Sequence, residues 1–154
     1  MEELLKELVE KNRKFTADGN VANYIPELDK ADKNALGIYV TTLDGQEFFA
    51  GDYNTKFTIQ SISKIISLML AILDNGEEYV FSKVGMEPSG DPFNSIRKLE
   101  TSSRKKPYNP MINAGAIAVA SMIKGKDDRE KFLRLLDFAK LITEDDTLDL
   151  NYKI

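Results

Sequence analysis

The sequence predicts a mixed α/β fold in which an antiparallel sheet packs with a layer of helices. Two β-prone segments, residues 35–43 and 46–50, precede several apolar segments with helical character in the later part of the chain. Strands that come first and helices that follow are typical of a fold with separate layers. At 154 residues the chain fits one domain with a core of its own.

The first third is predicted to form a helix, a loop and a hairpin. Residues 1–11 read as an amphipathic helix, and Pro26 favours an extended loop before a short helix. Asp44-Gly45 between two β-prone runs predicts a tight hairpin turn with both residues at positive φ. The side chains expected to face inward from the first helix are Leu4, Leu5, Leu8 and Val9.

The rest of the chain is predicted to be helical around one long loop. Residues 62–73 are so apolar on all sides that we expect a buried helix, capped near Asn75-Gly76. Residues 84–94 are dense in Gly and Pro and predict a loop, and long loops in compact domains are often functional. Residues 106–116 pass from a proline-rigid turn into a closely packed helix.

The last segments complete this prediction. Asp127-Asp128 predicts the N-cap of a helix through Ile142, with one apolar face. Residues 147–154 alternate polar and apolar side chains, which predicts a half-buried strand. That pattern runs to the last residue, so we interpret the chain as cut short. The side chains expected on the apolar face of the helix are Phe132, Leu135, Leu136 and Ala139.

Composition excludes several classes of function. The formal charge of −4 with interspersed signs provides no basic stripe for nucleic acid, and no apolar stretch reaches the roughly 18 residues of a membrane span. The charged N-terminus does not resemble a signal peptide, so we expect a soluble, cytoplasmic protein. Without cysteine or histidine the chain has no disulfide and no thiolate chemistry, and we predict no metal and no cofactor.

Ser61 and Lys64 are the candidate catalytic pair. Their spacing of three residues at the start of an apolar run places both on one helical face. A serine hydroxyl needs an adjacent base to become a nucleophile, and a lysine desolvated in apolar surroundings can be that base. Because the sequence lacks histidine, lysine is the partner that remains.

Three other Ser-x-x-Lys pairs have the same spacing, so context must decide among them. Two lie in a basic cluster where a lysine is solvated, and one lies at the end of a helix, far from its positive dipole end. For Asn113 the sequence leaves two interpretations open, a core or capping asparagine and a functional one. The three other pairs are Ser102–Lys105, Ser103–Lys106 and Ser121–Lys124.

Four blocks of sequence, in the same order, resemble the serine-dependent glutaminases, which hydrolyse L-glutamine to L-glutamate and ammonia. The resemblance covers most of the chain and implies a fold similar to serine β-lactamases and D-Ala-D-Ala peptidases, with a sheet flanked by helices. The blocks are residues 21–26, 60–64, 87–94 and 106–116.

The resemblance also implies roles for individual residues. Ser61 matches the nucleophile that forms a γ-glutamyl ester, and Lys64 matches its activating base. Tyr24 and Gln60 match residues that line the same pocket, with Tyr24 among the catalytic set. Asn113 matches an asparagine that binds the amino-acid head group of the substrate. L-Glutamine is the implied substrate, and a homotetramer or dimer is the implied assembly.

Length is where the chain departs from that family. The resemblance implies that residues 1–154 are the N-terminal portion of a single glutaminase catalytic domain, lacking groups that complete the substrate site. We therefore expect little or no activity from this chain alone. Two alternatives remain: a non-catalytic fragment or oligomerising module that pairs through its sheet edge, and a penicillin-recognising serine hydrolase, whose further motifs are not found here.

Overall fold

The computed structural model describes residues 1–95 and 106–152. Its chain divides into two compact units, the first formed by Met1–Thr58 with the end of the chain from Asn151, and the second by Ile59–Leu150. The first unit contains the sheet and the second is helical, so the predicted α/β composition with an antiparallel sheet is confirmed. Among the described residues, no helix combines the length and apolarity that crossing a membrane requires.

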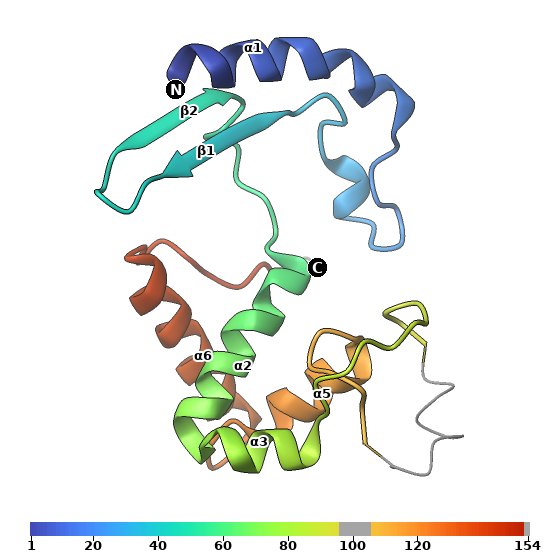
Figure 1. Cartoon of the computed structure of the whole chain (residues 1–154), viewed down its shortest axis with the longest axis vertical. Coiled ribbons are helices and arrows are strands. Elements are labelled where there is room, and N and C mark those ends of the chain that lie inside the picture. The colour runs from blue at the N-terminus through green and yellow to red at the C-terminus, as the bar shows by residue number, and fades with distance from the viewer. Residues whose placement is uncertain (96–105, 153–154) are drawn as a thin grey trace. The chain divides into compact units, whose positions relative to one another are not determined.

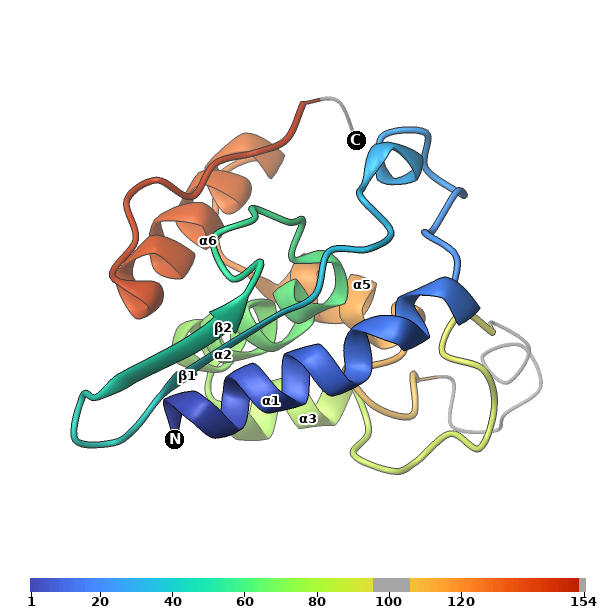
Figure 2. The ribbon, with the colours of Figure 1, turned by 90° about the horizontal axis from the view of Figure 1, so that it is seen from above.

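In the first unit a helix covers one face of a β-hairpin (Figure 1; Figure 2). Helix α1 spans Glu2–Arg13, with acidic residues in its first turn and basic residues in its last, as the helix dipole favours. Strands β1 (Gly37–Thr41) and β2 (Glu47–Gly51) pair antiparallel. Two short 3-10 helices, η1 (Lys14–Asp18) and η2 (Leu28–Lys30), connect α1 to the hairpin.

The core of the first unit lies between α1 and the hairpin. Leu5 and Val9 of α1 and Ala50 of β2 are each only 5% exposed. Leu4 and Leu8 stay exposed, so only half of the predicted inward set of α1 is correct. The two-stranded hairpin is narrow, so it covers only part of the apolar face of α1. Half-buried side chains around this core are Leu36, Ile38, Val40 and Phe48.

The hairpin turn differs from the prediction. Of the two turn residues only Gly45 has positive φ, 81°, so Asp44 does not adopt the left-handed conformation. The loop covers residues 42–46 and is closed by the amide of Gly45, which donates to the Thr42 carbonyl over 2.9 Å. The Asp44 carboxylate accepts from the side chains of Thr42 and Gln46, and these bonds favour the wider loop.

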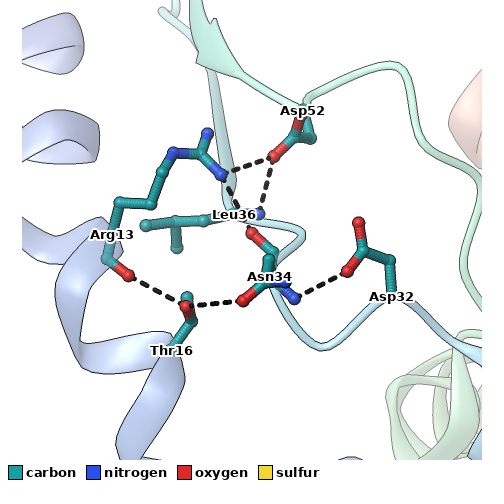
Figure 3. A network of polar contacts seen from close by, with 6 residues as sticks. All are labelled: Arg13, Thr16, Asp32, Asn34, Leu36 and Asp52. Atoms are coloured by element: carbon teal, nitrogen blue, oxygen red, sulfur yellow. Dashed lines mark hydrogen bonds and ion pairs between the residues drawn. The ribbon is translucent and has the colours of Figure 1, made fainter.

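A polar network joins the end of α1 to the hairpin, as Figure 3 shows. One carboxylate oxygen of Asp52 accepts from the Leu36 amide over 2.9 Å and from Arg13 Nη1 over 3.1 Å. Arg13 Nη1 also donates to the Asn34 carbonyl over 2.9 Å. The hydrogen bond from Leu36, followed by that from Arg13, lowers the pKa of the Asp52 carboxyl.

In the second unit α2 (Ser63–Asn75) is the central helix, and it contacts each of the other helices that the structure describes there. It follows the 3-10 turn η3 (Gln60–Ile62) and ends at Gly76, as predicted. The other helices are α3 (Glu77–Lys83), α5 (Asn113–Met122) and α6 (Asp128–Thr143), with Asp127 as the N-cap of α6. The short helix α3 was not predicted, because seven residues show too little periodicity.

The core of the second unit lies where these helices meet. Val80, Val84 and Val119 have no exposed surface, and burying each contributes roughly 1.5–3 kcal/mol. They pack with Leu70, Ala71 and Ile123. The prediction that α2 is buried on all sides is wrong for this chain, since Ile65 is 52% exposed and Leu73 is 70% exposed. The apolar surface of α2 is larger than the area that the neighbouring helices in the described part of the unit cover.

An ion pair fixes α6 against the end of α2. Arg134 donates to both oxygens of Asp74, over 2.8 and 2.6 Å, and the Lys124 amide donates to the same carboxylate over 2.7 Å. The Asp74 side chain is only 8% exposed. The hydrogen bonds from Arg134, the largest cause, and from Lys124 lower the pKa of Asp74.

The end of the described chain contradicts one prediction. Residues 147–152 form no strand, and residues 153–154 lie outside the described part. The Thr147 amide donates to the Asp145 carboxylate over 2.8 Å, and the Leu150 amide donates to the Asp149 carboxylate over 2.7 Å. These acidic side chains satisfy backbone groups that a strand would present to a neighbour.

Candidate functional site

Ser61 lies in η3, the single turn that leads into α2. The preceding residue, Gln60, has a φ of 42°, which is unusual for a residue with a side chain. Strained backbone of this kind costs on the order of 1–3 kcal/mol and is concentrated at functional sites. The Ser61 side chain is exposed, and its hydroxyl makes no hydrogen bond to any residue of the described part. Ser61 is therefore presented without a competing partner.

Lys64 lies in the first turn of α2, three residues after Ser61. Its Nζ donates to the Met111 carbonyl over 2.9 Å and to Asn113 Oδ1 over 2.7 Å. Nζ also lies 5.6 Å from the centre of the Phe93 ring, within the range of a cation–π contact. All three contacts are with uncharged groups, and the side chain is half-buried.

The hydrogen bonds of Lys64 occupy two of the three positions on its Nζ atom. An ammonium has three N–H donors, while the neutral amine has two donors and one lone pair. The carbonyl of Met111 and the amide oxygen of Asn113 use two donors. The third position of Nζ is a proton in the ammonium and a lone pair in the neutral amine.

Asn113 is the first residue of α5, and its backbone amide donates to the Phe93 carbonyl over 2.8 Å. Because Lys64 Nζ can only donate to an amide oxygen, Oδ1 must face Lys64. The Nδ2 donors therefore point elsewhere, and the Asn113 side chain is exposed. Asn113 is not the N-cap of α5, which is Ile112, and its role in substrate binding stays a prediction.

The loop that begins after α3 is held by two backbone hydrogen bonds to the segment before α5. The Gly85 amide donates to the Pro107 carbonyl over 2.8 Å, and the Glu87 amide donates to the Tyr108 carbonyl over 3.0 Å. A small hollow of about 10 Å³ lies here, with room for roughly one water, so it cannot hold an amino acid. Its lining residues are Ser89, Asp91, Pro92, Ser95, Pro107, Tyr108 and Ile112.

The structure brings together some of the predicted site residues. Lys64 and Asn113 are in direct contact, and Gln60 and Ser61 lie on the turn that precedes Lys64. Tyr24 belongs to the first unit, where its side chain is 73% exposed, and its catalytic role stays a prediction. Within residues 1–95 and 106–152, no group of three or more acidic side chains is arranged to hold a metal ion.

The competing Ser-x-x-Lys pairs differ from the first. Ser121 lies near the end of α5 and donates its hydroxyl to the Ala118 carbonyl over 2.7 Å, so that hydroxyl has a partner. Ser102 and Ser103 lie outside the described residues. Lys106 donates to the Phe81 carbonyl over 3.1 Å, away from the predicted site.

Sequence reasoning missed three participants at Lys64. The Phe93 ring lies near Nζ and its carbonyl accepts from the Asn113 amide, the Met111 carbonyl accepts from Nζ, and Asn109 Oδ1 accepts from the Met111 amide. A backbone carbonyl leaves no signal in residue type, so Met111 could not have been found in this way. Phe93 and Asn109 both lie in blocks that carry the family resemblance, and that position was the available signal.

Comparisons with known proteins agree on one family. The family model described as Glutaminase matches residues 19–154. A glutaminase of Fusobacterium nucleatum subsp. nucleatum is 97% identical over 154 residues, which cover 100% of this chain and 51% of that protein. The chain spans about half the length of the curated relatives it matches.

Solved structures give the same result for the fold. A probable glutaminase of Bacillus subtilis superposes with a TM-score of 0.81 at 42% identity, over 91% of this chain and 42% of the other. A probable glutaminase from Bacillus subtilis complexed with 6-diazo-5-oxo-L-norleucine gives a TM-score of 0.76 at 40% identity, over 90% of this chain and 40% of the other. The fold of this chain is therefore that of part of these structures.

Proposed function

This chain belongs to the glutaminase family, and we propose that it carries the nucleophile and the base for hydrolysis of L-glutamine to L-glutamate and ammonia. We assign residues 1–154 to the N-terminal portion of one catalytic domain, because the curated relatives are about twice as long. The remaining half of such a domain would complete the substrate site. This chain by itself is expected to have little or no activity.

In the proposed reaction, Ser61 Oγ attacks the side-chain carboxamide carbon of glutamine while neutral Lys64 Nζ takes the hydroxyl proton. The tetrahedral intermediate collapses, the C–N bond breaks, and Lys64 returns the proton to the leaving nitrogen, which departs as ammonia. Water then attacks the γ-glutamyl ester, Lys64 accepts a proton from it, and the ester C–O bond breaks. Glutamate leaves, and Ser61 regains its proton from Lys64.

The observation that carries this proposal is the placement of Lys64 Nζ between two uncharged acceptors, 2.9 Å from the Met111 carbonyl and 2.7 Å from Asn113 Oδ1. The contacts of Nζ among the described residues are with these two oxygens and with the Phe93 ring, and none of them is a carboxylate. The strained backbone of Gln60 supports the same site, because it sets the turn on which Ser61 is presented.

Further roles follow for the other predicted residues. The Nδ2 group of Asn113, turned away from Lys64, is suited to donate to the carboxylate of the substrate's amino-acid head group. Gln60 and Tyr24 are proposed to line the same substrate site. A relative complexed with 6-diazo-5-oxo-L-norleucine, an amino acid that carries a reactive diazoketone on its side chain, supports an amino-acid substrate of this size.

We also propose that the complete protein is a cytoplasmic homotetramer or dimer that acts on free glutamine and needs neither nucleic acid nor a membrane. The interspersed charges of the chain, with a net formal charge of −4, support this for nucleic acid. Sedimentation of the assembled protein would measure its oligomeric state directly.

The test uses the chain together with the half that its relatives possess. The remaining half of the Fusobacterium nucleatum glutaminase, which is 97% identical in the shared part, would be produced separately and mixed with this chain. Ammonia release from L-glutamine is expected, and Ser61→Ala should lower it by about 10⁴ or more. Ser121→Ala, which alters another Ser-x-x-Lys serine, should leave it unchanged.

Covalent labelling gives a second result from the same mixture. 6-Diazo-5-oxo-L-norleucine should add to the peptide that contains Ser61, as measured by mass spectrometry of a digest. A complex of the two halves that releases ammonia equally well with Ser61→Ala would show that Ser61 is not the nucleophile.

A further inference from the structure

We propose that Asn109 is a positioning residue for Lys64, because it fixes the peptide group whose carbonyl holds the lysine Nζ. This inference rests on the proposed function in that Lys64 serves there as the base. Its geometry can nevertheless be tested on Lys64 without any measurement of turnover.

Asn109 binds the segment just before α5 through its side-chain oxygen. Oδ1 accepts from the backbone amides of Met111 and Ile112, over 3.0 and 3.1 Å. One oxygen thus gathers two successive backbone N–H groups, a local turn that asparagine favours. The two amides are the last ones before the amide of Asn113, which donates to the Phe93 carbonyl.

The peptide group between Met111 and Ile112 transmits this contact to Lys64. No cis peptide bond occurs in the described chain, so the carbonyl and the N–H of this group point in opposite directions. Its N–H end is held by Asn109 Oδ1 and its carbonyl end accepts from Lys64 Nζ over 2.9 Å. Fixing one end of a planar group fixes the other, and such chains of hydrogen bonds strengthen one another.

Asn109 is itself held firmly enough to act in this way. Its Nδ2 donates to the Glu87 carbonyl over 2.8 Å, across a separation of 22 residues. On its other side, its backbone carbonyl lies directly against α5, because a Cβ built on Gly115 would come within 1.8 Å of the Asn109 oxygen. The side-chain oxygen is therefore supported by the loop on one side and by the helix on the other.

Two substitutions separate the parts of this arrangement. Asn109→Asp keeps an oxygen for the two amides but loses the donor to the Glu87 carbonyl. Asn109→Ala loses both. Asn75→Ala is the matched control, because Asn75 is another structural asparagine of the same unit that donates to the carbonyls of Ala71 and Met122 and does not contact Lys64.

The measurement is the rate of reductive methylation of Lys64 in the whole chain, followed by mass spectrometry and expressed relative to the exposed Lys126. A half-buried Nζ held by two acceptors should react slowly. Asn109→Ala should raise the Lys64 rate on the order of tenfold, since the Met111 carbonyl is no longer held toward Nζ and the hydrogen bond between them weakens. In Asn109→Asp and Asn75→Ala the Lys64 methylation rate should stay close to that of the unaltered chain. Both substitutions should nevertheless lower the free energy of unfolding measured in urea.

Two results would overturn the proposal. One is a folded Asn109→Ala chain in which Lys64 stays as slow as before. The other is an equal rise of the Lys64 methylation rate in Asn109→Ala and Asn75→Ala, which would mean that either substitution loosens the whole unit. If Asn109→Ala does not fold, amide hydrogen exchange in the unaltered chain decides: slow exchange at Ile112 supports the clamp and rapid exchange refutes it. Failure of glutamine hydrolysis in the assembled halves would leave all these rates unaffected, so the two proposals fail separately.

Discussion

Lys64 at the start of α2 donates to Oδ1 of Asn113 at the start of α5, over 2.7 Å and across 49 residues of sequence. This contact joins the turn that presents Ser61 to the start of α5, where the Asn113 amide donates to the Phe93 carbonyl. The proposed base is therefore positioned by a neighbouring helix and loop as well as by its own helix.

Asn113→Asp should preserve the contact but impair its chemistry. The carboxylate still accepts from Lys64, yet its negative charge stabilises the ammonium and repels the carboxylate of a substrate. In the assembled halves we expect ammonia release to fall by on the order of 100-fold or more. Asn54→Asp, at an exposed residue of the first unit, adds the same charge and should have no effect. Full activity of Asn113→Asp would mean that Asn113 Oδ1 need not be neutral.

Gly115→Ala should destabilise the chain, although alanine favours helices. In an open helix this change would stabilise by about 1 kcal/mol. At Gly115 the new Cβ would lie 1.8 Å from the Asn109 carbonyl oxygen, a backbone atom that cannot move freely, so we expect a net loss of about 1–3 kcal/mol. Urea unfolding measures it. Gly19→Ala, whose Cβ would have its nearest atom at 3.9 Å, is the control, and equal behaviour of the two variants would contradict the close approach.

Asp74→Ala should uncouple α6 from α2 and change the response to acid. It removes two hydrogen bonds from Arg134 and one from Lys124, which we expect to cost about 1–3 kcal/mol at neutral pH. Because folding lowers the pKa of Asp74, its contribution is present above the ordinary carboxyl pKa of about 3.9 and fades as the pH falls through the lowered value.

The measurement for Asp74 is a series of urea unfolding curves between neutral pH and pH 3. The difference between the unaltered chain and Asp74→Ala should shrink below about pH 4. Asp137→Ala, which alters an exposed carboxylate on the same helix α6, should show neither the cost nor the trend. A difference that grows on acidification would mean that the sign of the Asp74 shift is wrong.

Asp52→Ala should loosen the hairpin from the end of α1 (Figure 3). The Leu36 amide and the Arg13 guanidinium lose their common acceptor, so hydrogen exchange at Leu36 should accelerate by on the order of tenfold. Because this ion pair is solvent-exposed, we expect little change in global stability. Asp18→Ala, at an exposed carboxylate of the same unit, serves as the comparison. Unchanged exchange at Leu36 in Asp52→Ala would show that Asp52 does not anchor the hairpin.

Much of the secondary structure could be predicted from local sequence. The helix start at Asp127, the end of α2 at Gly76 and the two strands all depend on signals within a few residues, and the structure confirms them. The turn at Asp44-Gly45 and the strand expected after Thr147 were wrong, because acidic side chains bonded nearby backbone or side-chain groups instead. Local polar competition of this kind is not visible in a hydrophobic pattern.

The candidate pair was likewise available from the sequence, since Ser61, Lys64 and the apolar run behind them lie in one short segment. The groups that hold Lys64 in place could not be predicted from the sequence. Met111, Asn113 and Phe93 lie 29 to 49 positions further along the chain than Lys64, and only the packing of α5 against α2 brings them to it. By itself the sequence determined the family and predicted a type of chemistry, because residue types and short spacings carry both signals. Only the tertiary structure decided which oxygens surround the lysine, because hydrogen bonds to backbone carbonyls depend on where distant segments meet and not on which side chains they carry.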